Sequence, residues 1–234
     1  MQLVAYGAQD IYLTGNPQIT FFKVVYRRHT NFSMESIEQT WSGTSNTLGT
    51  GRCTATVSRN GDLVHRMYLE IVCGATGSGV NNPSSSAITD IEIEIGGQKI
   101  DKHTGKWMET WAELTEPNPN GLAAQVGNTT FTGTVFQNMS CMGGALGVNS
   151  GANRYWVPLQ FWFCRNAGLA LPLIALQYHE VKVILNYNFA TNFESSADSK
   201  LWCDYIYLDT DERRRFAQVS HEYLIEQVQE QTLT

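Results

Sequence analysis

The stretch from Arg154 to Asn188 constrains the fold of this chain more than any other part of the sequence. In its first part, Tyr155 to Cys164, large apolar side chains occupy both alternating sets of positions, which predicts a strand covered on each side. In its last part, Val181 to Asn188, apolar and polar residues alternate, which predicts a strand with one wetter face. The apolar segment between them contains Pro172, which favours a buried crossover or a short strand and turn over a long helix. These features predict an all-β sandwich core.

Length, composition and charge narrow the class of protein further. The 234 residues are enough for one large sandwich or two small domains, and no linker that would divide two domains appears. The net charge of −6 disfavours direct binding of nucleic acid, because the average field repels phosphate backbones. No apolar run approaches the roughly 20 residues of a membrane span, and the start of the sequence lacks the pattern of a secretion signal. The sequence therefore predicts a protein that is made in the cytoplasm and does not insert into a membrane.

Cysteine and histidine residues show no pattern of a metal or redox site. The cysteines are odd in number, widely spaced and without a C-x-x-C pair, which predicts reduced and mostly buried thiols in a reducing compartment. They are Cys53, Cys73, Cys141, Cys164 and Cys203. The histidines lack the H-x-x-x-H and H-x-H spacings of metal ligands, so core or surface roles are predicted for them and no cofactor is expected. They are His29, His65, His103, His179 and His221.

Two β-hairpins are predicted in the first half of the chain. In the first, a strand over residues 52–58 turns at Asn60-Gly61 into a strand over Leu63 to Cys73. In the second, a strand over Ile88 to Ile95, with its isoleucines facing inward, turns at Gly96-Gly97 into residues 98–101. The remaining strand signals are a β-rich run over residues 19–26 and a final strand over residues 201–208. This spacing of strands and turns is typical of an antiparallel sandwich.

One helix and two loop regions complete the prediction. Trp107, Trp111 and Leu114 have helical spacing, and Thr104 precedes them as a candidate N-cap, so a helix is expected over residues 104–115. Residues 74–86 are small, polar and rich in helix and strand breakers, which predicts a surface loop. Residues 118–153 are predicted as long loops that carry one short strand.

The most tempting catalytic pattern is an acidic strand face. Alternation places Asp90, Glu92 and Glu94 on one face, and paired carboxylates serve glycoside hydrolases. The order of the three residues differs from the E-x-D-x-E pattern of jelly-roll glucanases, so an exposed acidic face is the preferred interpretation. Trp107 and Trp111 could stack on sugars, but their helical spacing favours a core role. A carbohydrate-binding or glycoside-hydrolase jelly roll remains the alternative function.

Three further local patterns carry little functional weight. Arg27, Arg28 and His29 form a basic cluster so short that solvation or a local ion pair is expected. Asp209, Asp211 and Glu212 lack the glycine and the distal glutamate of a calcium loop. Three asparagines match the N-glycosylation acceptor pattern, which is common by chance and needs a secretory route. These glycosylation candidates are Asn31, Asn128 and Asn138.

Five blocks of sequence follow one another across nearly the whole chain. They are GAQDIYLTGNPQITFFKVVYRRHTNFSMESIEQT (Gly7 to Thr40), SRNGDL (Ser58 to Leu63), EIEIGGQKIDKH (Glu92 to His103), GLALPLIALQYHEVK (Gly168 to Lys182) and DYIYLDTDERRRFAQVSHEYLIEQ (Asp204 to Gln227). In this order the blocks closely resemble the major capsid proteins of large icosahedral DNA viruses of algae and protists, especially the chlorovirus type.

The resemblance implies a fold and a structural, non-enzymatic role. The expected fold is an eight-stranded antiparallel jelly-roll sandwich over residues 26–212, with one short helix and long loops, preceded by an N-terminal arm over residues 1–25. Because family members are about twice as long, residues 213–234 are expected to be a connector toward a second jelly roll. Three copies of the family protein form a pseudo-hexagonal trimeric capsomer in the virion. The resemblance implies contacts with neighbouring capsomers and minor capsid proteins on the inner face, near an internal viral membrane.

Overall fold

The computed structural model describes residues 31–44, 49–73, 83–115, 153–191 and 197–231. The chain divides into two compact units, residues 1–31 and 32–234, and the two sheets belong to the second unit. The predicted N-terminal arm over residues 1–25, the β-rich run over residues 19–26, the basic cluster Arg27 to His29 and the short strand within residues 118–153 lie outside the described residues.

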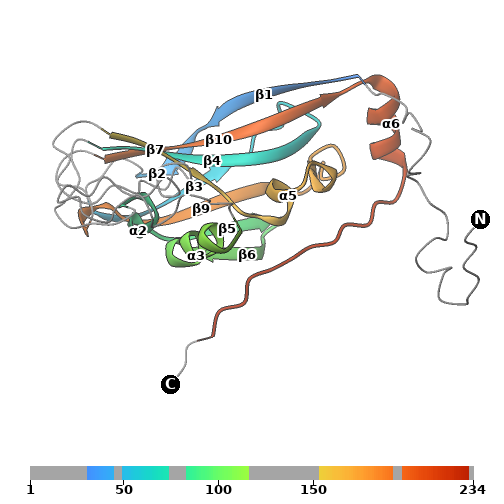
Figure 1. Cartoon of the computed structure of the whole chain (residues 1–234). Helices are drawn as coiled ribbons and strands as arrows, with labels where there is room; N and C mark the ends of the chain where they lie inside the picture. The colour runs from blue at the N-terminus through green and yellow to red at the C-terminus, as the bar shows by residue number, and fades with distance from the viewer. Residues whose placement is uncertain (1–30, 45–48, 74–82, 116–152, 192–196, 232–234) are drawn as a thin grey trace, which may run out of the picture. The chain divides into compact units, whose positions relative to one another are not determined.

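Two antiparallel sheets form the second unit (Figure 1). In sheet A the strand order is β1-β10-β4-β7, and the two-residue strand β8 also pairs with β4. In sheet B the order is β2-β3-β9-β5-β6. The strands of sheet A are β1 (Phe32–Gln39), β10 (Ala197–Leu208), β4 (Leu63–Cys73), β7 (Asn153–Pro158) and β8 (Leu171–Pro172). Those of sheet B are β2 (Trp41–Gly43), β3 (Thr50–Thr56), β9 (Val181–Asn188), β5 (Ile88–Ile95) and β6 (Gln98–Thr104).

The order of the strands is that of a jelly roll. Strand β1 and the three-residue β2, separated by one residue, belong to different sheets, and later strands also alternate between the sheets. Eight of the ten strands in the described ranges make the paths β1-β10-β4-β7 and β3-β9-β5-β6, to which β2 and β8 are short additions. Each sheet places strands that are distant in sequence next to one another, as the Greek-key connections of jelly rolls require.

The predicted first hairpin is wrong, because its two strands lie in different sheets. Strand β3 pairs with β2 and β9, whereas β4 pairs with β10, β7 and β8. Gly61 also lacks the positive φ that the predicted turn requires. Its small size serves a close approach instead, since a Cβ atom there would lie 2.8 Å from the Cβ of Tyr205. Residues 57–62 therefore cross from one sheet to the other.

The second hairpin and the helix are confirmed. Strands β5 and β6 pair in antiparallel register across Gly96 and Gly97, whose φ values are 61° and 83°. Ile91 and Ile93 are buried on the inner face. Helix α3 (Gly105–Thr115) begins after Thr104, whose Oγ1 accepts a hydrogen bond of 3.2 Å from the backbone N–H of Trp107. Both features depend on short-range sequence signals, which is why the pattern alone located them.

The long strand expected over Tyr155 to Cys164 is only half present. Strand β7 ends at Pro158, and residues Trp162–Arg165 form the short helix α5. The helix is buried through Trp162, Phe163 and Cys164. A run that is apolar at nearly every position does not distinguish a buried strand from a buried helical turn. The rest of this stretch agrees with the prediction, since β8 is a short strand followed by turns and β9 has one buried and one wetter face.

Besides the predicted α3, the described ranges contain three short α-helices that were not predicted from the sequence. Helix α2 (Pro83–Ala87) occupies the end of the predicted loop over residues 74–86, of which residues 74–82 are not described. Helix α5 follows β7, and α6 (Thr210–Gln218) follows β10. The side chain of Asp209 caps α6 by accepting a hydrogen bond from the backbone N–H of Glu212. The predicted domain boundary after residue 212 falls within α6 and stays a prediction.

The core lies between the two sheets, and among the cysteines whose side chains the structure describes it contains Cys53, Cys164 and Cys203. Cys53, Cys164 and Cys203 are buried and free, and burial raises the pKa of the Cys53 and Cys164 thiols to about 12 and that of Cys203 well above its ordinary value. These thiols are protonated at neutral pH, in agreement with the prediction of reduced, buried cysteines.

Among the described residues, no helix is long and apolar enough to span a membrane.

Buried Tyr205 gives a testable dependence of stability on pH. Its hydroxyl donates to the carbonyl oxygen of Ser58 at 2.6 Å, and burial raises its pKa from 10.0 to about 12. A raised pKa in the folded state means that the stabilisation is complete below pH 10 and is lost as the pH rises toward 12. We therefore expect the unfolding free energy of Tyr205→Phe to fall less steeply between pH 10 and pH 12 than that of the unmodified protein. Urea denaturation at successive pH values measures both.

The buried thiols destabilise both the unmodified protein and Tyr205→Phe at alkaline pH. The difference between the two proteins in the slope of unfolding free energy against pH therefore reports Tyr205 alone. The variant Tyr178→Phe serves as the control, because that ring is 93% exposed, and it should keep the slope of the unmodified protein. Equal slopes for Tyr205→Phe and the unmodified protein would contradict the prediction.

Candidate assembly surface

The outer face of sheet A carries a mixed aromatic and charged surface. One row across the sheet pairs Glu38 of β1 with Trp202 of β10, Trp202 with Tyr68 of β4, and Tyr68 with Pro158 of β7. The next row pairs Lys200 with Glu70, and Glu70 with Trp156. We call these residues, together with Arg154, the sheet A surface. Aromatic and arginine side chains of this kind are enriched in the cores of protein–protein interfaces.

Glu70 is the centre of the sheet A surface. Its carboxylate accepts a hydrogen bond of 2.7 Å from the indole N–H of Trp202, and its other oxygen lies 3.1 Å from Nε of Arg154. Trp156 and Trp202 lie beside each other, with ring centroids 6.2 Å apart. Glu70 is only 3% exposed although it lies on an outer face, because these side chains surround it. The cluster is therefore held rigid before any partner binds, which lowers the entropic cost of association.

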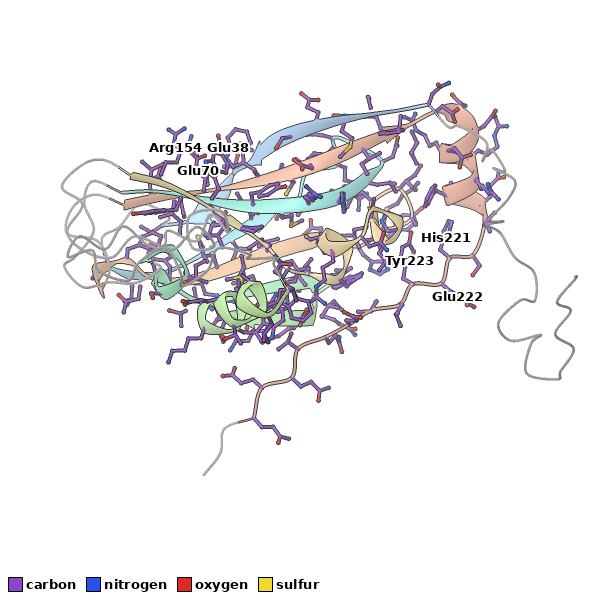
Figure 2. The ribbon with its side chains drawn as sticks, in the orientation of Figure 1. Glu38, Glu70, Arg154, His221, Glu222 and Tyr223 are labelled. Atoms are coloured by element: carbon purple, nitrogen blue, oxygen red, sulfur yellow. The ribbon has the colours of Figure 1, made fainter. Side chains whose placement is uncertain are left out.

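Charged groups surround this cluster. Lys200 and Glu38 form an exposed ion pair of 3.4 Å on the neighbouring strands. Figure 2 shows Glu38, Glu70 and Arg154 gathered on the same part of sheet A. An exposed pair of this kind contributes little to stability, roughly 0–1 kcal/mol, but charges at the rim of an interface determine which partners fit.

The edge strand β1 extends this surface with exposed apolar side chains. Phe32 is 64% exposed and Met34 is 51% exposed. They pair in register with Leu208 and Ile206 of β10. Ile206 is buried against Leu63 and Ala170, so the exposed apolar area at this end of sheet A comes from the side chains of β1. Edge strands with exposed apolar side chains are typical sites of association between chains.

The acidic face of β5 is an ordinary charged strand face. The carboxylate of Asp90 accepts a hydrogen bond of 2.6 Å from Asn186 and lies 3.6 Å from Nζ of Lys102, while Glu92 and Lys99 form an ion pair of 2.6 Å. A pocket of about 470 Å³ beside this face is lined by Asp90 but not, among the described residues, by Glu92 or Glu94. The three carboxylates do not converge on one pocket, so the geometry favours an ion-paired strand face over the hydrolase. This face is half-buried and not exposed as predicted, since the side chains of Glu92 and Asp90 are 18% and 13% exposed.

Trp107 and Trp111 pack within the protein. The Trp107 ring stacks on the buried imidazole of His103 at 4.1 Å and on Trp111 at 5.5 Å. The guanidinium of Arg165 covers Trp111 at 4.3 Å from the ring centroid. These contacts use the ring faces that a sugar would need. Trp107 packs against the core in agreement with the prediction, whereas Trp111 is half-buried beneath Arg165 and lies outside the core.

The histidines in the described ranges are separate from one another. His65 contacts the carbonyl oxygen of Phe163 at 2.9 Å, and Nε2 of His103 lies 2.8 Å from the buried carboxylate of Asp101. His221 contacts the carbonyl oxygen of Phe216, and His179 is exposed. No group of three or more metal-binding side chains occurs within these ranges. Of the glycosylation candidates, Asn31 is exposed before β1, while Asn128 and Asn138 are not described.

Sequence patterns did not identify the sheet A surface, although a weak signal was present. In each of β4 and β10 one outward aromatic side chain, Tyr68 or Trp202, lies between outward charged ones, which resembles an ordinary solvated strand face. Glu70, Trp156 and Trp202 come from three strands that are far apart in the sequence. Only the pairing of β10 with β4 and of β4 with β7 brings them together.

Comparisons with known proteins point to a single family. A family model described as the N-terminus of the major capsid protein matches residues 20–209. The chain is 54% identical to the major capsid protein of Pyramimonas orientalis virus over 98% of its own length and 58% of that protein. It is 47% identical to the major capsid protein of Paramecium bursaria Chlorella virus 1 over 97% of its length and 52% of that protein. The chain thus spans little more than half the length of these relatives.

The solved structures agree with the sequence comparisons. A quasi-atomic model of the PBCV-1 virus capsid superposes with a TM-score of 0.70 at 38% identity, over 90% of this chain and 50% of the matched chain. The match confirms the predicted jelly-roll fold. Relatives of this chain are structural proteins, which favours assembly over the carbohydrate-binding or hydrolase alternative.

Proposed function

This chain belongs to the family of viral major capsid proteins and matches its N-terminal part, and from this premise we propose that it builds the shell of a large icosahedral DNA virus. Three copies form a pseudo-hexagonal capsomer, and the capsomers contact one another across the shell. The protein acts through its surfaces and not through a reactive centre. Its place is in the virion after synthesis in the host cytoplasm.

The sheet A surface is the observation that supports this proposal. A shell protein needs a rigid scaffold that presents the same contact many times. The sandwich supplies the scaffold. The centre of the sheet A surface supplies an interface core, because hydrogen bonds and packing already fix Glu70 and its neighbours Arg154, Trp156 and Trp202. Phe32 and Met34 add apolar area at the edge. In this proposal the sheet A surface contacts a neighbouring subunit within the trimer.

The other partners follow from the family and are part of the same proposal. Minor capsid proteins contact the inner face of the shell, and an internal membrane lies nearby without insertion of this chain. Direct binding of nucleic acid is not proposed, because the net charge is −6. Residues 1–25 act as an arm, and residues 213–234 as a connector toward a second jelly roll.

Light scattering on the purified chain tests the proposal. We expect a concentration-dependent species with three times the 26.2 kDa mass of the chain. Trp202→Ala should weaken trimer formation by roughly tenfold or more, because aromatic residues at the centre of an interface carry much of its binding energy.

Tyr178→Ala is the matched control, since it removes an exposed aromatic ring outside the sheet A surface. It should leave the mass distribution unchanged. The sheet A surface would not be the contact between subunits of the trimer if the protein were a monomer at every concentration, or if Trp202→Ala left trimer formation unchanged.

A further inference from the structure

The segment after α6 is attached to the sandwich although it forms no helix or strand. Residues 219–231 have no regular secondary structure and leave α6 as an extended trace (Figure 1). Figure 2 shows His221, Glu222 and Tyr223 along this segment. Many of its side chains are exposed, including Leu224 at 73%. A segment with so little buried apolar surface needs specific polar contacts to keep one position.

Three consecutive residues supply such contacts. Glu226 places a carboxylate oxygen 2.6 Å from Nη1 of Arg165. The side-chain amide of Gln227 donates a hydrogen bond of 2.6 Å to the carbonyl oxygen of Ile100. The backbone N–H of Val228 donates to Oδ1 of Asp101 at 3.0 Å. The sandwich thus contacts a carboxylate, an amide and a main-chain N–H in succession.

The Arg165 contact is organised by the sandwich itself. The guanidinium lies 4.3 Å from the ring centroid of Trp111 and 5.8 Å from that of Trp107. Its Nε donates to the carbonyl oxygen of Gln160 at 3.0 Å. Stacking and hydrogen bonding both fix the plane of the guanidinium, and Nη1 then points to the carboxylate. A fixed arginine loses less entropy than a free one when it binds a carboxylate.

The Asp101 contact is also built into the sandwich. Asp101 lies in β6, the edge strand of sheet B, and its side chain is 1% exposed. One carboxylate oxygen lies 2.8 Å from Nε2 of buried His103, while the other accepts from the backbone N–H of Lys102 at 2.9 Å. The N–H of Val228 gives this second oxygen another donor, and a buried carboxylate is stabilised by such donors. The neighbouring carbonyl of Ile100 belongs to the same edge strand.

We propose that Glu226, Gln227 and Val228 form a docking motif that binds a preformed three-point site at Arg165, Ile100 and Asp101. The partner of the site is this chain's own extended segment, and docking fixes the point from which the following polypeptide leaves the sandwich. It also covers part of β6, which is the outermost strand of sheet B among the described residues, and this limits pairing of β6 with other chains. The inference rests on the proposed function in one respect, that a second domain follows the connector.

Hydrogen exchange at the Val228 amide tests the docking. In the unmodified full chain this amide should exchange slowly, and in the double variant Glu226→Ala, Gln227→Ala it should exchange faster by roughly tenfold or more. Both substitutions lie outside the sandwich, so the exchange rates of amides in β4 and β9 should stay the same. Glu222→Gln is the matched control, because it removes an exposed charge of the same segment outside the motif, and it should leave the Val228 amide protected.

Two results would overturn the proposal. One is a Val228 amide that exchanges as fast as that of Leu224 in the unmodified protein, and the other is an exchange rate that the double variant does not change. Light scattering on the same samples separates this inference from the capsid proposal. If the double variant loses protection at Val228 and still forms the trimer, docking is independent of assembly. If the Val228 amide is already unprotected in the unmodified protein while that protein forms trimers, docking alone is refuted.

Discussion

Replacing Gly105 by alanine is expected to lower the free energy of unfolding by about 3 kcal/mol, and with it Tm by roughly 6–12 °C. Gly105 is the first residue of α3, where α2 and α3 pack together. A Cβ atom there would lie 2.5 Å from the carbonyl oxygen of Ile88 and closer still to that of Ser85. Both obstacles are backbone atoms, so no side-chain rotation relieves the clash and α3 has to move.

Thermal unfolding followed by circular dichroism measures this effect, with Gly168→Ala as the matched control. A Cβ at position 168 would lie 3.3 Å from Oδ1 of Asn166, a side-chain atom that can move. The control should change stability by less than about 1 kcal/mol. Similar losses of unfolding free energy for the two variants would show that the close contact between α2 and α3 does not restrict the size of the side chain at position 105.

Replacing Phe161 by alanine is expected to lower the free energy of unfolding by about 3–5 kcal/mol. Phe161 is fully buried in the connection between β7 and α5. Its ring stacks on His103 at 4.9 Å and on Phe163 at 5.9 Å, so alanine leaves a cavity beside a buried imidazole. The surrounding side chains come from both the sheet and the helices, which restricts how far the site can collapse.

Urea denaturation measures this loss, and Phe161→Leu is the control. Leucine keeps most of the apolar volume and should cost less than about 1.5 kcal/mol. Equal losses for the alanine and leucine variants would indicate that ring stacking, and not the cavity, dominates at this position. A loss below about 1 kcal/mol for alanine would contradict the packing described for the core.

Predictions from the sequence succeeded where neighbouring residues determine the structure. The turn at Gly96-Gly97 needs two residues with positive φ, which glycine adopts easily, and Thr104 caps α3 with its own side chain. The alternation of isoleucine with acidic residues in β5 predicted that Ile91 and Ile93 face the core of the sandwich, and both are buried there. The family resemblance, carried by blocks across the chain, agreed with the relatives found by comparison.

The predictions failed where the partner of a segment lies far away in the sequence. Residues 52–73 contain a plausible hairpin, but β3 and β4 pair with β9 and β10 in different sheets. The run over Tyr155 to Cys164 is apolar on both faces, so its pattern fits a strand and a buried helix equally well, and α5 forms at its end.

By itself, the sequence determined that this protein is an all-β sandwich of the capsid family, because alternation, turn residues and family motifs are properties of the chain alone. Only the tertiary structure decided which strands are neighbours. It therefore decided that Glu70, Trp156 and Trp202 form one surface, and that Asp101 and Arg165 receive the segment after α6. The physical reason is that strand pairing and burial depend on contacts between distant residues, which no local pattern encodes.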